Sequence, residues 1–360
     1  MTPLGDILAA QIAAEGPMRL DRYMSVCLLH PEHGYYATRD PFGRAGDFIT
    51  APEISQMFGE MLGLCLAQAW LDQGRPAPFI LAEAGPGRGT LMADMLRAMK
   101  AVRGMVDAAE VHLIEASPTL REIQKQKLAP HQVVWHETID DLPDSPLFLV
   151  ANEFLDALPI RQFQRVEQGW AERQIGLSDE GALTPGLAPP TRFEALEPRM
   201  ADTVPGNVVE TCAAAVSFTE RLAARIARQG GAALLIDYGN WHSKGDTFQA
   251  LKAHEPVDPF ATPGEADLTA HVDFEPLAQA AHRVGAKVSA MTAQGLLLER
   301  LGITARAQRL AQALSGAARE THIAAHRRLT HPEEMGHLFQ ALALVAPNAP
   351  LPPGFDPNTD

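Results

Sequence analysis

A loop with alternating glycines follows an apolar run near residue 80. The stretch FILAEAGPGRGT (79–90) runs from apolar residues into Glu83 and then places Gly85, Gly87 and Gly89 at alternate positions. Glycine is needed where the backbone takes a positive φ or where a ligand touches the main chain. The spacing differs from the GxGxxG of dinucleotide sites, and the loop lacks the Gly-Lys-Ser/Thr ending that binds triphosphates. Because Glu83 would repel phosphate and attract a cation or an ammonium group, the loop predicts a ligand without phosphates.

A second carboxylate, Glu115, ends the later apolar run VHLIE. A carboxylate at the tip of the second strand of a parallel sheet is positioned to accept both hydroxyls of a ribose. Glu115 and the glycine loop together predict a site for an adenosine-containing ligand. The alternative is a glycine turn that serves only the packing of a helix on a strand.

The elements that would position these residues alternate between short apolar runs and helical stretches from residue 78 onward. Apolar strands separated by helices predict a parallel sheet covered on both faces, whose ligands bind at the carboxyl edge. The expected strands are PFILAEAG, EVHLIEAS, QVVWHE, PLFLVANEF and GGAALLIDYG, with KVSAMT (287–292) and HLFQALALV (337–345) at the far edge. The expected helices are 91–103, 118–128 and 207–229.

The remaining segments predict additions to this core. Residues 1–75 are expected to form an N-terminal helical and lid segment with helices at 4–14 and 52–72, before a core at 76–345. Insertions are expected at about 160–200 as a hairpin and proline-rich excursion, at 238–272 as a loop, and at 293–334 as an amphipathic helix. That helix has an apolar stripe typical of core, with a dimer or substrate-protein surface as the alternative. Residues 346–360 are expected to be a loosely packed tail.

The glycine loop resembles motif I of class I methyltransferases, E-x-G-x-G-x-G, and Glu115 resembles their motif II acid. Further stretches, PEHGYY, GDFITAPEISQMFGE, ANEFLDALPIRQF, LIDYG and DLTAHVDF, follow in order over nearly the whole chain. Together they resemble the MidA-like methyltransferases, the group that contains the mitochondrial complex I assembly factor that dimethylates an arginine symmetrically. Ala84 departs from the pattern, since family members often have Leu there, and this change removes no ligand group.

The resemblance implies a Rossmann-like class I α/β fold. Its seven-stranded sheet is mostly parallel, with the last strand antiparallel, and helices cover both faces. The cofactor would be S-adenosylmethionine, with the glycines under its methionine part and Glu115 at its ribose. The expected cofactor-binding residues are Glu83, Gly85, Pro86, Gly87, Gly89, Thr90, Glu115, Ala116, Asp47, Thr50 and Trp135.

Three of these residues lie outside the loop and the pair Glu115 and Ala116. Asp47 and Thr50 offer polar atoms for the methionine amine and carboxylate, if GDFITAPEIS folds back over the cofactor. The alternative is that this segment only connects two helices. Trp135 is expected beside the adenine, although an aromatic residue at a strand end is often plain core.

A third group of polar residues follows the apolar run of the fourth strand, at the end of PLFLVANEF and just beyond it. An arginine guanidinium needs carboxylates to hold its fork and to spread its charge. Glu153 is expected to be the first carboxylate and Asp156 the second, with Asn152 holding Glu153 or offering its own carbonyl. The alternative is that Asn152 caps a helix starting at Glu153 and that Asp156 faces solvent. Asp237, at the end of LLIDYG, is expected either to join the site or to order a loop.

Composition restricts the partners. The net charge of −14 argues against a surface for duplex nucleic acid or for membranes, both of which need clustered Lys and Arg. The three cysteines form no CxxC pair, and no metal cluster emerges. Neither a signal peptide nor an apolar run of membrane-spanning length is evident, so a cytoplasmic protein is expected.

The sequence therefore predicts an S-adenosylmethionine-dependent methyltransferase. The resemblance implies a protein substrate, methylated symmetrically on an arginine ω-nitrogen, such as a respiratory complex I subunit; a homodimer is an open expectation. Two alternatives remain, namely an assembly chaperone for which methylation is secondary and a small-molecule methyltransferase.

Overall fold

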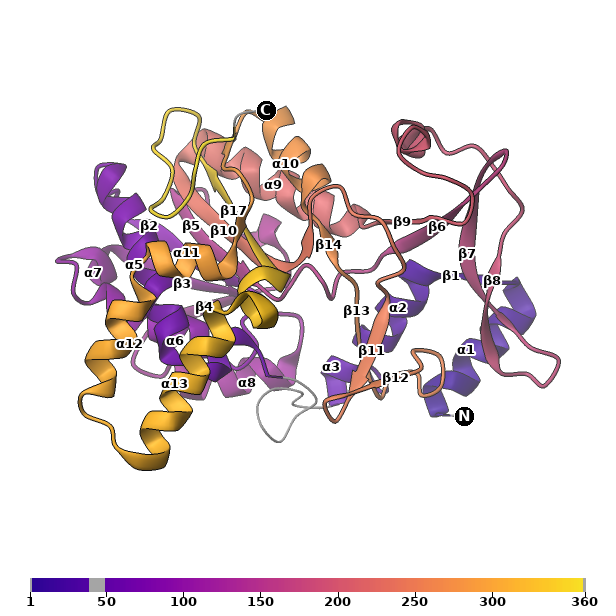
Figure 1. The fold of residues 1–360 in the computed structure, drawn as a ribbon, viewed down its shortest axis with the longest axis horizontal. Coiled ribbons are helices and arrows are strands. Elements are labelled where there is room, and N and C mark those ends of the chain that lie inside the picture. Colours follow the sequence, from indigo (N-terminus) through magenta and orange to yellow (C-terminus); the bar gives the residue numbers. More distant parts are fainter. Residues whose placement is uncertain (1, 39–48, 359–360) are drawn as a thin grey trace. The chain divides into compact units, whose positions relative to one another are not determined.

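The computed structural model describes residues 2–38 and 49–358, which form two compact units (Figure 1). The first unit combines Met1–Phe48, Asp156–Ala215 and His242–Asp273, and the second combines Ile49–Leu155, Val216–Trp241 and Phe274–Asp360. This division differs from the expected boundary at residue 75, since the helix of residues 56–72 belongs to the second unit. That helix packs in the apolar core of the second unit through Phe58, Leu62 and Leu66.

The second unit is built on a sheet whose main path runs β15-β17-β10-β5-β2-β3-β4. Strands β4, β3, β2, β5 and β10 are parallel, whereas β17 runs antiparallel to both β10 and β15. The bounds are β2 Phe79–Ala84, β3 Ala109–Ile114, β4 Val133–His136, β5 Leu147–Asn152, β10 Gly231–Asn240, β15 Lys287–Val288 and β17 Phe339–Val345; the short β16, Thr292–Ala293, also pairs with β17. The strands lie where the apolar runs predicted them, except that the single strand expected at 287–292 is two short strands, β15 and β16, and the sheet is of mixed direction.

Burial on both faces explains why these strands read as continuous apolar runs. Every residue of β2, β5 and β17 is buried. Alternate side chains, such as Phe79 and Leu81 of β2, join one core cluster with helices α5 and α6. In Figure 1, helices α9 and α10 lie on the other side of the strands. The sheet is therefore the middle layer of three.

The helices predicted at 91–103 and 118–128 lie close to helices of the second unit, the other three predictions differ, and the helices at 105–108 and 274–283 were not predicted. The helices of this unit are α4 Ala51–Ile54, α5 Gln56–Asp72, α6 Thr90–Met99, α7 Met105–Ala108, α8 Pro118–Lys127, α9 Ala213–Gln229, α10 Phe274–Arg283, α11 Gln294–Arg300, α12 Ile303–Ala311 and α13 Gly316–Thr330. The helix expected at 52–72 is split at Ser55, whose side chain caps α5 by accepting from the Met57 N–H at 3.2 Å. The helix expected at 207–229 starts only at Ala213, because residues 208–211 pair as a strand. The single helix expected at 293–334 is three helices, interrupted by Gly302 at φ 91° and by Ser315.

Within its described residues, the first unit contains two antiparallel sheets and three α-helices. One sheet has the order β1-β7-β6-β9 with β8 beside β7, and the other has the order β12-β11-β13. The bounds are α1 Pro3–Glu15, β1 Met18–Arg19, α2 Leu20–Leu29, α3 Tyr35–Thr38, β6 Arg161–Val166, β7 Gly169–Leu177, β8 Leu183–Leu187, β9 Val208–Thr211, β11 Gln249–Lys252, β12 Glu255–Val257, β13 Asp267–Thr269 and β14 Val272–Asp273. The predicted hairpin near residue 160 is the β6–β7 pair, whereas the loop predicted at 238–272 is wrong, since β11, β12 and β13 pair there.

The C-terminal segment is packed, which corrects the expected loose tail. Phe355 is buried in the core of the second unit, and the Ala290 N–H donates to the Asp356 carbonyl oxygen at 2.9 Å. Pro357 forms an isolated β-bridge with Ser289. Within the described ranges, 2–38 and 49–358, no helix is long and apolar enough to cross a membrane.

Candidate functional site

The glycine loop between β2 and α6 takes a conformation that only glycine adopts easily. Gly85, Gly87 and Gly89 have φ of 65°, 51° and 77°. A Cβ on Gly85 would lie 2.7 Å from Cδ2 of Phe154, so that this position also allows a close approach. Pro86 is buried, and its carbonyl oxygen accepts from the Gly89 N–H at 2.7 Å, which closes the turn before α6.

Glu83 lies beneath this loop. Its side chain is buried, with a relative exposure of 3%. Burial raises the pKa of Glu83 well above its usual range, the charge of Glu115 adds to the rise, and the N–H of Met92 opposes it by donating to the carboxylate. The bond to Met92 ties the end of β2 to the first turn of α6. Glu83 therefore fixes the loop, and its direct contact with a cofactor stays a prediction.

Glu115 follows β3 at the same edge of the sheet, because β3 is parallel to β2 and Ala84 is in register with Ile114. Its Oε1 accepts from the Ser117 N–H at 2.8 Å, and its Oε2 accepts from Gln124 Nε2 at 3.0 Å. Burial raises the pKa of Glu115, and these two donors offset part of the rise. Ala116 next to it is exposed.

Gln124 of α8 is a functional residue that the sequence analysis missed. It is fully buried, with a relative exposure of 0%. Its Nε2 donates to the Gly87 carbonyl oxygen at 2.8 Å as well as to Glu115, and its Oε1 accepts from Trp135 Nε1 at 2.8 Å. One side chain thus joins the glycine loop, the acid and the aromatic residue that were expected around the cofactor. The available signal was a polar residue within the buried stripe Leu120, Gln124 and Leu128 of an amphipathic helix.

Thr90 and Thr50 belong to a second set of contacts in this unit. Thr90 is the first residue of α6, and its Oγ1 donates to Glu53 Oε1 of α4 at 2.5 Å. Thr50 is buried at the N-terminus of α4, and its carbonyl oxygen accepts from the Glu53 N–H at 3.0 Å. The segment before α5 is thereby linked to the glycine loop. Asp47 lies outside the described residues.

The end of β5 brings Asn152 and Glu153 together. Glu153 has φ of 51°, a conformation that is uncommon for residues other than glycine and is concentrated at functional sites. Its Oε1 accepts from Asn152 Nδ2 at 3.0 Å and from the Ala51 N–H at 2.9 Å. The Asn152 side chain is 6% exposed, and its Oδ1 is buried without a hydrogen-bond partner among the residues that the structure describes. No helix begins at Glu153, so the helix-cap alternative for Asn152 is wrong.

Asp237, at the end of β10, orders the chain after β5. It is fully buried. Its Oδ2 accepts from the N–H groups of Phe154 at 3.2 Å and Leu155 at 2.9 Å, and its Oδ1 accepts from the Tyr238 N–H at 2.9 Å. Of the two roles expected for Asp237, the structure therefore favours loop ordering.

Asp156 belongs to the first unit, where it is buried beside two other polar groups. Its carbonyl oxygen accepts from the Ala270 N–H at 3.0 Å. The Tyr36 hydroxyl donates to Asp267 Oδ1 at 3.0 Å. Burial raises the pKa of Tyr36, and the charges of Asp267 and Asp156 add to this rise, so the three side chains lie close together.

The arrangement in the second unit fits an adenosine ligand with a positively charged methionine part. Glu115 offers a carboxylate for a ribose diol, and three glycines with positive φ carry the chain from β2 into α6 at the same edge of the sheet. Glu83 Oε2 and Asn152 Oδ1 are buried acceptors without hydrogen-bond partners in the described part of the chain. Acceptors suit ammonium and sulfonium groups and do not suit phosphates. Across the same residues, no group of three or more His, Cys, Asp or Glu side chains is placed to hold a metal ion.

Fold and site together define an α/β methyltransferase that uses S-adenosylmethionine. Residues 61–292 match the family model described as "Putative S-adenosyl-L-methionine-dependent methyltransferase". The chain belongs to this family.

Curated relatives resemble the chain over nearly its full length. It is 37% identical to protein arginine methyltransferase NDUFAF7 of Danio rerio, over 94% of this chain and 86% of the relative. The identity with the Homo sapiens protein of the same name is 34%, over 96% of this chain and 84% of the relative.

Two solved structures are similar to this chain over nearly its full length. A crystal structure from Burkholderia thailandensis with bound S-adenosyl-homocysteine has a TM-score of 0.85 and 32% identity, and the match covers 98% of this chain and 93% of that one. A second structure from Burkholderia thailandensis has a TM-score of 0.84 and 31% identity, covering 99% of this chain and 95% of that one.

The comparison corrects one prediction. A cytoplasmic location is wrong by this comparison, because the curated relatives are named as mitochondrial proteins. The expectation depended on sparse cysteines and on the lack of an evident signal peptide. Sparse cysteines indicate a reducing compartment without saying which one.

Proposed function

We propose that the protein transfers the methyl group of S-adenosylmethionine to an arginine ω-nitrogen of a protein substrate. The observation that carries the proposal is the Asn152–Glu153 pair, in which a buried amide oxygen without a described partner lies beside a carboxylate. The relatives named protein arginine methyltransferases support the same substrate group.

We assign two tasks to the pair: it orients the guanidinium of the substrate arginine, and it balances the positive charge of that group. A guanidinium presents five N–H donors in a planar fork, which a carboxylate such as Glu153 accepts. Asn152 Oδ1 would accept a further N–H, and Asn152 Nδ2 holds Glu153 Oε1 in place. S-adenosylmethionine supplies an electrophilic methyl group on a positively charged sulfur. The proton released from the ω-nitrogen is assigned to the carboxylate of Glu153, and Asp156 is proposed as a second carboxylate.

The remaining cofactor contacts are part of the same proposal. Glu115 would hold the ribose and Trp135 would lie beside the adenine. The glycine loop, with Pro86, Thr90 and Glu83, would surround the methionine part. Thr50, Asp47 and Ala116 are proposed to complete this set.

The finer features come from the family resemblance. We propose symmetric dimethylation, with a complex I subunit or a similar protein as substrate, because GDFITAPEIS and NEFLDALP match the MidA-like pattern. The order of the strands, with β17 reversed beside β10, supports a class I arrangement within residues 76–345. A homodimer stays a prediction.

The test uses purified protein, methyl-labelled S-adenosylmethionine and cell extract. Acid hydrolysis of the labelled protein band should release ω-N-methylarginines, and the symmetric isomer separates chromatographically. Label on another amino acid, or only in small molecules, would contradict the proposal. Glu153→Gln should abolish labelling, because a neutral amide cannot balance the guanidinium charge, whereas Glu122→Gln on the exposed side of α8 should leave it unchanged.

A further inference from the structure

Helices α12 and α13 form a hairpin in the second unit (Figure 1). Most side chains of these two helices are exposed or only half-buried. Helix α13 has 15 residues, of which Leu329 alone is buried. Isolated helices of this length are marginal in water, so α13 depends on other contacts for its order.

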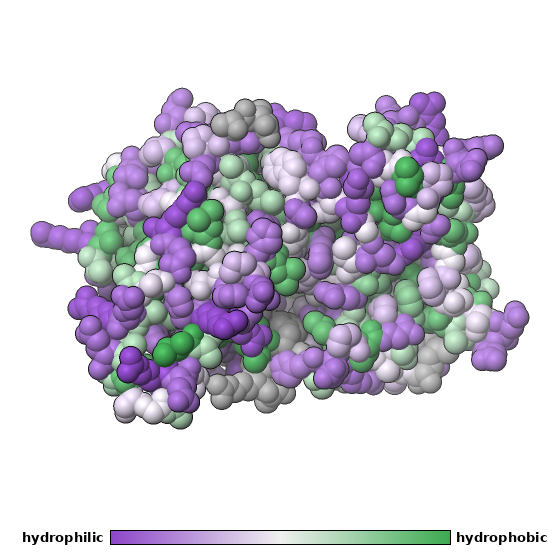
Figure 2. Space-filling model, viewed as in Figure 1, coloured by the Kyte–Doolittle hydropathy of each residue, from purple (hydrophilic) through white to green (hydrophobic). Residues whose placement is uncertain are grey.

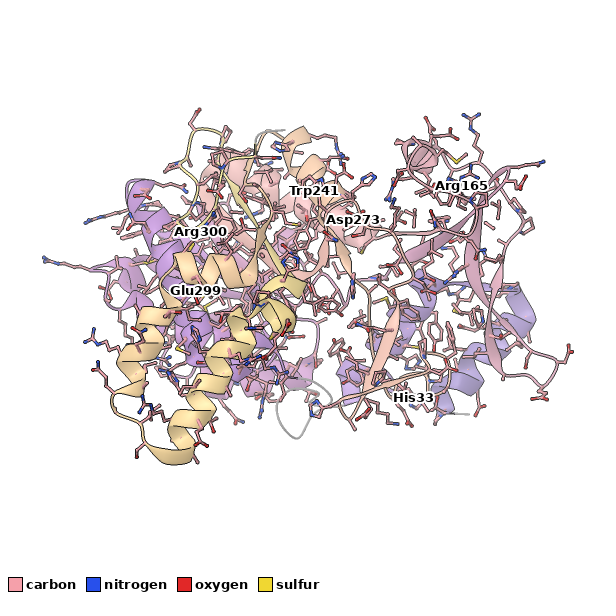
Figure 3. All side chains as sticks on the ribbon, viewed as in Figure 1. His33, Arg165, Trp241, Asp273, Glu299 and Arg300 are labelled. Atoms are coloured by element: carbon pink, nitrogen blue, oxygen red, sulfur yellow. The ribbon has the colours of Figure 1, made fainter. Side chains whose placement is uncertain are left out.

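The contacts that hold the hairpin join its two helices and fix its base. His322 Nε2 lies 2.9 Å from the Ala307 carbonyl oxygen, and His326 Nε2 lies 2.9 Å from Thr304 Oγ1. Thr304 Oγ1 also donates to Glu299 Oε1 at 2.7 Å, and Figure 3 shows Glu299 on α11, beside the start of α12. Two polar contacts thus join α12 to α13.

Helix α12 is fixed to the core by a separate ion pair. Arg306 donates from Nε to Glu60 Oε2 at 2.7 Å and from Nη2 to Glu60 Oε1 at 3.1 Å. Burial raises the pKa of Glu60, but the hydrogen bonds from Arg306 and Arg97 outweigh this effect and lower the pKa overall. This ion pair anchors α12 to α5 at the side of the hairpin.

A groove of about 530 Å³ runs between α12 and α13. Ala307, Ala311, Leu314 and Ile323 contribute its apolar lining, and the small alanines leave room for a third element. Binding sites for ligands have volumes of roughly 300–1,000 Å³. Ile323 is 54% exposed, and Figure 2 shows a small hydrophobic patch within a hydrophilic surface in the region of α12 and α13.

The hairpin is basic in an acidic chain. From Ile303 to Thr330 it contains one carboxylate, Glu320, and five arginines, whereas the whole chain has a net charge of −14. The arginines are Arg306, Arg309, Arg319, Arg327 and Arg328. Arg309, Arg319 and Arg328 make no ion pair or hydrogen bond with the residues that the structure describes. This positive charge is therefore available to a partner.

One arginine of α13 lies beside the apolar lining of the groove, where a helix of a partner could contact both. Arg319 and Ile323 lie at i and i+4 on α13 and both line the groove, whereas Arg327, at i+8, is paired with Glu334. An amphipathic helix laid in the groove would place apolar side chains against Ile323 and a carboxylate beside Arg319.

We propose that the groove between α12 and α13 binds an acidic amphipathic helix of a partner protein. The apolar lining favours a peptide over nucleic acid, which needs a dense basic track along its phosphates. The proposal does not depend on the methyl-transfer proposal, because binding at the hairpin can be measured without any turnover.

The experiment is a selection from a displayed library of helical peptides that is unbiased in charge, with the full chain as bait. Enriched clones should carry Asp or Glu beside apolar residues at i and i+4. Their synthetic peptides should bind about tenfold more weakly to Ile323→Glu and to Arg319→Glu, and more weakly at high salt. The matched controls Leu187→Glu, another exposed apolar residue, and Arg103→Glu, another exposed arginine of the second unit, should bind as the wild type does.

Several results would overturn the proposal. These are the absence of enriched clones, enrichment of basic peptides, equal affinity of the groove variants and the wild type, or displacement of the peptide by an equal concentration of single-stranded RNA. If light scattering shows a dimer that Ile323→Glu converts to a monomer, the occupant is a second copy of this chain and the proposal is wrong.

Discussion

Gln124 Nε2 donates a hydrogen bond to Glu115 Oε2 at 3.0 Å, and the same nitrogen donates to the Gly87 carbonyl oxygen at 2.8 Å. The two acceptors belong to the turns after different strands, β2 and β3. Their separation is therefore set by one buried amide on α8, and the geometry of the proposed cofactor site depends on a residue outside both motifs.

Replacing Gln124 with Leu should weaken S-adenosylhomocysteine binding about tenfold, because Glu115 and Gly87 lose their shared donor. The free energy of unfolding should fall by about 1–3 kcal/mol, since the two buried acceptors, Glu115 and the Gly87 carbonyl, and the half-buried Trp135 indole lose a partner. Calorimetry measures the affinity, and the fluorescence of Trp135, whose indole N–H also loses its acceptor, gives an independent readout. Gln126→Leu, on the exposed side of the same helix, is the control, and equal effects of the two changes would contradict the positioning role.

Gly85→Ala should destabilise the folded protein and prevent cofactor binding. The positive φ costs about 1–2 kcal/mol for a residue with a Cβ, and the new atom would also meet Phe154 at 2.7 Å. Gly104→Ala separates the two effects, since Gly104 has φ of 80° and open space around its Cα. Chemical denaturation of both variants should show the larger loss for Gly85→Ala. Similar losses would mean that Phe154 moves aside without cost.

Glu83→Gln should flatten the dependence of stability on pH. Burial raises the pKa of Glu83, so the folded state binds more protons than the unfolded state between the ordinary and the raised pKa. Stability therefore falls as the pH rises through this window, and the glutamine variant should lose less. Denaturation of the cofactor-free protein from about pH 5 to about pH 8 measures this difference. Glu137→Gln, an exposed carboxylate, is the control, and parallel curves for wild type and Glu83→Gln would refute the prediction.

Asn152→Ala should lower kcat for methyl transfer about hundredfold, because Glu153 loses the donor that orients it. The affinity for S-adenosylhomocysteine should be unchanged if the pair serves the substrate. Single-turnover kinetics and calorimetry separate the two quantities. A loss of cofactor affinity with an unchanged kcat would assign Asn152 to the cofactor instead.

The strands and their ends were predictable because buried parallel strands are continuous apolar runs that stop at polar or glycine residues. Glu83, Glu115 and Asn152 were placed at one edge of the sheet on this basis, and the register of β2, β3 and β5 agrees. The start of α9 was not predictable from periodicity, because Val208 and Val209 pair with β6 and tertiary contacts override the local pattern.

The finer features of the site had no clear sequence signal. A glutamate with positive φ, such as Glu153, looks like any other residue in the sequence. Gln124 stands in an otherwise ordinary amphipathic helix, and only its buried position reveals the three hydrogen bonds. The donor from Ala51 to Glu153 joins residues that are far apart in the chain, and no motif reports such a contact.

The interleaving of the two units constrains how the chain can fold as it is made. Helices α1 and α2 share a core with Leu268, yet that residue follows them by more than half of the chain. At ribosomal rates of about 5–20 residues per second, Leu268 is synthesised about ten seconds or longer after these helices. The core of the first unit can therefore be completed only after more than two thirds of the chain has been synthesised.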